Sequence, residues 1–144
     1  MVYEPGELKV VVFKNGKQWA TDTVKTAEAP ARLALQADRS TLRADGTDLS
    51  FITVKVVDRS GVIAPGANNR VQFTIDGPGD IAATDNGDPT SFEPFPSHER
   101  NAFNGYALVI VRTRAGQAGS IRLSAKSGDI EGGSLILRSV AGIE

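Results

Sequence analysis

Four carboxylates gather in the middle of the chain, and they are the first residues whose type could support chemistry. Asp85, Asp88, Glu93 and Glu99 lie close together in sequence. Two carboxyl groups held rigidly across a bond can act as general acid and nucleophile in a hydrolysis. That chemistry also needs an apolar pocket that raises the pKa of one of them, whereas the surrounding glycines and prolines predict a loop. We therefore expect Asp85 and Asp88 to cap turns and the two glutamates to face solvent.

Metal binding is the second possibility for this region. Asp76 and Asp80, together with Asp85, Asn86 and Asp88, could offer oxygen atoms to Ca²⁺. Their spacing does not follow the calcium loop of the EF-hand, so ordinary turn chemistry is the simpler interpretation. The chain has no cysteine, which excludes disulfides, thiolate nucleophiles and cysteine-bound zinc. We expect no metal site and no cofactor.

His98 is the only histidine of the chain. A catalytic triad would need a serine and an acid beside its ring. Ser97 and Glu99 are its sequence neighbours and point away from it in an extended chain. A structural hydrogen bond from His98 to a loop carbonyl is therefore the favoured interpretation.

Aromatic rings that stack on sugars are usually exposed tryptophans or tyrosines beside polar groups. Here Phe92, Phe95, Phe103 and Tyr106 follow one another closely, and three of the four are phenylalanines without a side-chain hydrogen bond. This composition favours buried packing over sugar recognition. Trp19 lies far upstream, and a core or interface role is expected for it as well.

The elements that must position these residues are strands. Short runs with period-two alternation are separated by clusters of glycine and proline. No long stretch has helical spacing, because Pro30 interrupts the best candidate at residues 24–37. About seven short strands with turns between them predict an all-β fold, an immunoglobulin-like β-sandwich, with a β-barrel as the alternative. Inward-facing rows are predicted at Leu33, Leu35 and Ala37; Ile52, Val54 and Val56; Val71, Phe73 and Ile75; Ile121, Leu123 and Ala125; and Leu135 and Leu137.

The segment from Asp88 to Asn104 has three prolines and no strand alternation. Loops of this length in compact domains usually have a function, and its phenylalanines argue against disorder. We predict that it packs across the sandwich edge or face with Phe92, Phe95 and Phe103 inserted, and that Arg100 pairs with a loop carboxylate. The candidate residues for binding or for an interface are Phe92, Phe95, His98, Arg100, Phe103 and Trp19.

The beginning of the chain has a different pattern. An Asn15-Gly16 pair between two apolar runs predicts a β-hairpin, which is barely stable alone in water. We therefore expect it to dock on the sandwich or to pair between copies of the chain. The chain divides into residues 1–28, a hairpin and linker left from the C-terminal end of a truncated preceding immunoglobulin-like module, and residues 29–144, the sandwich domain.

Charge and hydropathy exclude several classes of partner. The chain has 16 Lys and Arg against 17 Asp and Glu, a net charge of -1. A nucleic-acid platform or a polybasic membrane anchor would need a basic excess. No apolar run is long enough to span a bilayer as a helix, and no signal peptide is visible. We expect neither nucleic acid nor membrane as a partner.

Several motifs resemble a known family. Ala44-Asp45-Gly46-Thr47-Asp48 and the later Asn104-Gly105-Tyr106-Ala107 resemble bacterial immunoglobulin-like domains of the intimin and invasin type. More specifically, Thr84 to Phe92 followed by Ser97-His98-Glu99-Arg100 looks like the C-terminal module of family 2 glycoside hydrolases of the β-galactosidase type. The opening Tyr3 to Lys9, with Trp19 to Asp22, is similar to the end of the module that precedes it in those enzymes.

The resemblance implies a parent enzyme that is a retaining β-galactosidase with two catalytic glutamates on an upstream barrel. None of that barrel matches this chain, so we expect no catalytic residue here and an accessory role as brace, spacer or assembly surface. The expected partners are the other domains of the parent glycosidase, with a homo-oligomer through the hairpin as a further possibility. The family implies an exported bacterial parent, periplasmic or extracellular. The alternatives are a carbohydrate-binding or adhesion module and, as a third class, an independent enzyme.

Overall fold

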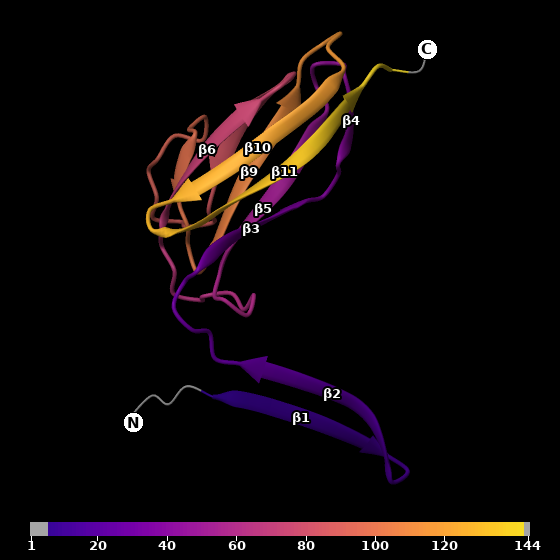
Figure 1. The fold of residues 1–144 in the computed structure, drawn as a ribbon, viewed down its shortest axis with the longest axis vertical. Helices are drawn as coiled ribbons and strands as arrows, with labels where there is room; N and C mark the ends of the chain where they lie inside the picture. The colour runs from indigo at the N-terminus through magenta and orange to yellow at the C-terminus, as the bar shows by residue number, and fades with distance from the viewer. Residues whose placement is uncertain (1–5, 143–144) are drawn as a thin grey trace.

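The computed structural model describes residues 6–142, with side chains described for residues 6, 11–17 and 26–142. All regular elements in this range are strands (Figure 1), and it contains no helix that could cross a membrane. The strands are β1 (Glu7–Lys14), β2 (Lys17–Lys25), β3 (Arg32–Ala37), β4 (Thr41–Arg43), β5 (Leu49–Val57), β6 (Arg70–Asp76), β7 (Gly79–Asp85), β8 (Glu99–Asn101), β9 (Tyr106–Thr113), β10 (Gly119–Ser127) and β11 (Ile130–Val140).

The first two strands form a hairpin of their own. β1 and β2 pair antiparallel about Asn15 and Gly16, which have positive φ values of 52° and 74°, as a tight hairpin turn requires. They make a separate two-stranded sheet, and Figure 1 shows this hairpin apart from the other strands. The expectation that it docks on the sandwich is therefore wrong. Pairing between copies stays a prediction, and the side chain of Trp19, on β2, lies outside the described residues.

The remaining strands form two stacked layers, and the predicted immunoglobulin-like sandwich is confirmed (Figure 1). One layer has the order β7-β9-β5-β3, and the other has the order β11-β10-β6-β8 with β4 beside β11. The layers are joined where β3 passes next to β11, at the parallel pair Arg32 and Glu131. β7 and β8 lie at the far ends of this path, so the loop that connects them crosses from one layer to the other.

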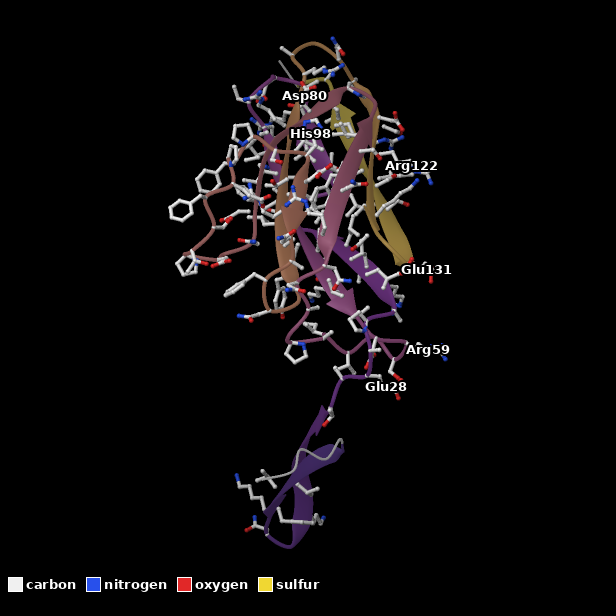
Figure 2. The ribbon with its side chains drawn as sticks, turned by 90° about the vertical axis from the view of Figure 1, so that its left-hand side faces the viewer. Glu28, Arg59, Asp80, His98, Arg122 and Glu131 are labelled. Atoms are coloured by element: carbon white, nitrogen blue, oxygen red, sulfur yellow. The ribbon has the colours of Figure 1, made fainter. Side chains whose placement is uncertain are left out.

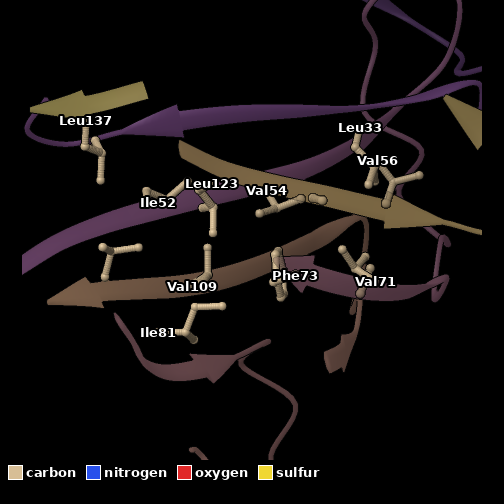
Figure 3. Close-up of a cluster of buried hydrophobic side chains, with 14 of the residues drawn as sticks. Leu33, Ile52, Val54, Val56, Val71, Phe73, Ile81, Val109, Leu123 and Leu137 are labelled. Carbon is tan, nitrogen blue, oxygen red and sulfur yellow. The ribbon is translucent and has the colours of Figure 1, made fainter. Parts of the chain in front are cut away.

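The core lies between the layers and comes from the predicted alternation. Ile52, Val54 and Val109 are fully buried, as is Leu123 of the opposite layer (Figure 3). Ile121, beside Leu123 on β10, is fully buried as well. Burying such a side chain contributes about 1.5–3 kcal/mol. The partly buried Leu35, Ala37, Ile75 and Leu135 pack against this cluster. The inward rows predicted from the sequence are therefore present.

One short strand was not expected. β8 lies inside the segment predicted to lack strands, and it pairs with β6 through Val71 and Arg100. Three residues are too few to show an alternation, and the edge position leaves one side of β8 without a partner strand. A strand this short is specified by the neighbour that it meets in the fold.

Candidate functional site

The β7–β8 loop, residues 86–98, is the longest connection that carries the predicted site residues. Two backbone hydrogen bonds fix its far end: the Thr84 amide donates to the Phe95 carbonyl at 2.7 Å, and the Phe73 amide donates to the His98 carbonyl at 2.8 Å. The first bond attaches the loop to β7, and the second attaches it to β6. The loop therefore closes the open side of the sandwich.

Aspartate and asparagine side chains shape the start of this loop. Asp85 accepts hydrogen bonds from the amides of Asn86 and Gly87, at 2.8 and 3.2 Å. Asp88 accepts from the Thr90 hydroxyl at 2.7 Å and from its amide at 2.8 Å. These bonds hold the pKa of Asp88 below its ordinary value. The predicted turn-capping role of Asp85 and Asp88 is confirmed.

Arg100 holds the loop from behind. Its side chain comes from the short strand β8 and is 2% exposed. Nη2 donates to the carbonyls of Thr84 at 2.8 Å and Pro94 at 2.7 Å, and Nε donates to the Thr84 hydroxyl at 3.2 Å. Nη1 donates to the Glu93 carbonyl at 3.3 Å and lies 3.5 Å from the Glu93 carboxylate. The predicted pairing of Arg100 with a loop carboxylate is confirmed, and the partner is Glu93.

Phe92 and Phe95 point away from the sandwich, which corrects the expectation that they are inserted. Phe92 is 99% exposed and Phe95 is 62% exposed, while Phe103 is partly buried and its backbone pairs with Tyr106. The buried Arg100 guanidinium explains why the rings of Phe92 and Phe95 face outward. Its donors require oxygen acceptors when buried, so the loop turns its carbonyl groups inward and its rings outward.

A shallow hollow of about 330 Å³ lies under the loop. Arg70 of β6 borders this region. Its guanidinium donates a hydrogen bond to the Glu93 carboxylate, and it forms an ion pair with the Glu99 carboxylate at 3.2 Å. Sequence reasoning missed Arg70, although its outward position in an alternating strand beside an acidic loop was a signal for it. The hollow is lined by Asp85, Asp88, Ser91, Phe92, Glu93, Pro94, Phe95 and Arg100.

This arrangement does not fit hydrolysis by two carboxylates. A general acid needs a raised pKa, whereas the pKa of Asp88 is lowered by its bonds to Thr90. Asp85 is engaged in capping its own turn. Within the described part of the chain there is also no group of three or more His, Cys, Asp or Glu residues placed to hold a metal ion. What the site offers is exposed aromatic rings beside carboxylates, which suits binding.

His98 stands apart from the hollow. Its side chain is exposed, and its backbone carbonyl accepts the hydrogen bond from Phe73. Figure 2 shows its ring near Asp80 of β7. The pKa of Asp80 is lowered, first by a hydrogen bond from Arg114 and to a smaller extent by the charge of His98.

Comparison with known proteins places this fold among glycosidases. Residues 33–136 match the family model of the glycoside hydrolase family 2 C-terminal domain 5. The chain is 45% identical over 125 residues to "Beta-galactosidase BoGH2A" of Bacteroides ovatus. The aligned region covers 87% of this chain and 15% of that protein. A "Beta-glucuronidase" of Formosa agariphila is 38% identical over 54% of the chain and 8% of its own length.

Solved structures show the same relationship. A family 2 glycosyl hydrolase from Bacteroides cellulosilyticus superposes with a TM-score of 0.89 and 32% identity, over 97% of this chain and 18% of that one. The D00-D0 domain of intimin shares the fold alone, with a TM-score of 0.56 and 19% identity over 94% of this chain and 65% of that one. The chain thus spans less than a fifth of the length of the glycosidases that it matches. It belongs to the glycoside hydrolase family 2 C-terminal domain 5 family.

Proposed function

We propose that the chain is a non-catalytic accessory module of a β-galactosidase-like glycoside hydrolase, in which it braces the other domains. The observation that carries this proposal is the β7–β8 loop, which presents the fully exposed ring of Phe92 on a backbone fixed by the buried Arg100. Rings that are exposed in an isolated domain and held in place are typical of contact surfaces.

The preference for a β-galactosidase as the parent comes from the relatives. The relative that matches 87% of the chain is named a β-galactosidase, whereas the β-glucuronidase from Formosa agariphila matches over 54%. The lowered pKa of Asp88 in the hollow supports a role without catalysis, because a general acid needs a raised pKa.

The test compares the 144-residue chain with the longer protein that contains it. We expect the longer protein to release nitrophenol from a chromogenic β-galactoside and the 144-residue chain to release none. Turnover by the 144-residue chain would overturn the proposal.

The bracing role is tested with Phe92→Ser. We expect this substitution to lower the melting temperature of the longer protein by a few degrees, because a buried contact is lost, and to leave that of the 144-residue chain unchanged. Ile136→Ser is the matched control, since Ile136 is 63% exposed on the outer face of the layer that contains β11. Equal melting temperatures for the parent and its Phe92→Ser variant would contradict the bracing role.

A carbohydrate-binding or adhesion module is the second candidate. The hollow favours it, because Phe92 and Phe95 lie beside the carboxylates of Asp85 and Asp88, and a ring face beside acceptor oxygens suits a sugar. Calorimetric titration of the 144-residue chain with galactosides and polysaccharides separates the two. Saturable binding that is lost in Phe92→Ser would support this candidate over the brace.

A further inference from the structure

Basic side chains follow one another across the outer face of β10, β11 and β4. On β10, Arg122 and Lys126 alternate with side chains that are buried in the core, so both face outward. Arg138 of β11 and Arg43 of β4 face outward for the same reason. All four side chains are exposed, and we call them the basic row. Figure 2 shows Arg122 on the outer side of the sandwich.

The register of the strands places the basic row along one diagonal line. Arg138 is the partner of Ser120 on β10, two residues from Arg122. Arg43 is in turn the partner of Val140 on β11, two residues from Arg138. Because neighbouring strands lie about 4.8 Å apart and rise about 3.3 Å per residue, the row extends over roughly 25–30 Å from end to end. A ligand must be extended to meet all four cations.

Within the described part of the chain, no carboxylate neutralises the basic row. None of its four side chains forms an ion pair or a hydrogen bond there. Asp76 of β6 lies opposite Arg122 in the register without forming an ion pair with it, whereas Arg70 of the same strand is paired with two glutamates. The strands β4, β10 and β11 hold four cations and one carboxylate, that of Glu131. This face is therefore basic, although the whole chain has a net charge of -1.

Small hydroxyl side chains fill the space between the cations. Ser124 of β10 lies opposite Ser134 of β11 and opposite Thr74 of β6. Ser120 and Thr41 flank Arg138 on its two sides. Hydroxyl groups both donate and accept hydrogen bonds, as the hydroxyls of a sugar require. The outward-facing residues of β4, β6, β10 and β11 include no aromatic ring, and such rings are what single-stranded nucleic acids stack on.

We propose that the basic row binds an acidic polysaccharide, a chain of sugars that carries carboxylate or sulfate groups. Three of the four cations are arginines, and a guanidinium binds an oxyanion through two parallel hydrogen bonds. The serine and threonine hydroxyls between the cations bind the uncharged parts of the sugars. The basic row shares no residue with the hollow under the β7–β8 loop, so this inference is independent of the proposed bracing role.

Titration of the 144-residue chain with sugars of different charge tests the proposal. The probes are fluorescently labelled fragments of polygalacturonate and of dextran sulfate, each long enough to span the basic row, and fluorescence anisotropy gives the affinity. Neutral dextran of the same length is the uncharged control. We expect at least one anionic fragment to bind and neutral dextran not to bind. With four cations engaged, the affinity should fall about 50-fold when the salt concentration rises from about 50 to 200 mM.

Two double variants separate the basic row from the charge of the whole chain. Arg122→Gln with Arg138→Gln removes two cations from the row, and Arg59→Gln with Arg112→Gln removes two exposed cations elsewhere. We expect the first to bind roughly tenfold more weakly, with about half the salt dependence, and the second to keep the affinity of the unsubstituted chain. Urea midpoints should be equal in all three proteins, because the changed side chains are exposed.

Four results would overturn the proposal. The first is that neither anionic fragment binds. The second is equal weakening by the two double variants, which would mean that binding follows the net charge alone. The third is equal affinity for oligothymidylate of the same length and charge, which would mean that the row does not recognise sugar. The fourth is loss of binding in Phe92→Ser, which would place the ligand in the hollow; we expect this variant to bind as the unsubstituted chain does.

Discussion

Arg100 is a buried charged residue that organises the β7–β8 loop. It donates to the carbonyls of Thr84, Glu93 and Pro94, and its planar fork of donors suits several acceptors at once. Lysine cannot reproduce this fork. We predict that Arg100→Lys lowers the free energy of unfolding by roughly 3 kcal/mol and increases amide exchange in the β7–β8 loop. Urea unfolding and hydrogen-exchange mass spectrometry measure the two effects.

Arg114→Lys is the control for this prediction. Arg114 pairs with Asp80 at 2.7 Å, and both side chains are nearly half exposed, so its replacement is expected to have little effect. If Arg100→Lys were as stable as Arg114→Lys, the loop would have to be held by contacts other than those of Arg100.

At the scale of elements, Asp48 connects three strands. It accepts two hydrogen bonds from Arg39, which follows β3, at 2.7 and 2.9 Å. It also accepts from the amide of Arg43 at the end of β4, at 2.8 Å, and from that of Leu49 at the start of β5, at 3.1 Å. The Arg39 guanidinium and these amides lower the pKa of Asp48 to about 2.

This lowered pKa predicts how stability depends on pH. The unfolded chain protonates Asp48 near its ordinary pKa of about 3.9, so the stabilisation is complete above that value and is lost as pH falls through about 2. We predict that Asp48→Asn lowers the free energy of unfolding at pH 7 by roughly 1 kcal/mol. The difference in unfolding free energy between Asp48→Asn and the unsubstituted chain should shrink between about pH 4 and pH 2.

Urea unfolding across this pH range measures the effect, and Asp129→Asn is the control, because Asp129 is exposed. A difference between Asp48→Asn and the parent that stays constant down to pH 2 would show that the ionised carboxylate is not the source of the stability.

The elements also show how far sequence reasoning extends. Alternation predicted the buried rows of β5 and β10, because burial on one face requires it. It could not predict the outward rings of Phe92 and Phe95, since their direction depends on where Arg100 finds its acceptors across the loop. The outward positions of Leu108 and Ile110 on β9 were missed for a related reason. Apolar residues on both faces of β9 look like an ordinary buried strand until the neighbouring layer is known to lie on one side only.

At the scale of the molecule, the chain has two parts that meet at a narrow joint. The Thr26 amide donates to the Gly6 carbonyl at 2.7 Å, which assigns Thr26 to the hairpin. The Glu28 amide donates to the Asp58 carboxylate at 2.9 Å, which assigns Glu28 to the sandwich. Ala27 alone lies between these two anchors, and Figure 2 shows Glu28 near Arg59 at the base of the sandwich.

This joint predicts the effect of shortening the chain. A chain that begins at Ala27 keeps the anchor at Glu28, and we expect its urea midpoint to equal that of the 144-residue chain. A chain that begins at Pro30 loses the amide that is the largest cause of the lowered pKa of Asp58. We therefore expect a lower urea midpoint and a higher Asp58 pKa in that chain, measured by NMR titration. Because Asp58 also accepts from the amides of Ser60 and Val62, each at 2.9 Å, its pKa should remain below the ordinary value. A loss of stability already in the chain that begins at Ala27 would mean that hairpin and sandwich unfold as one unit.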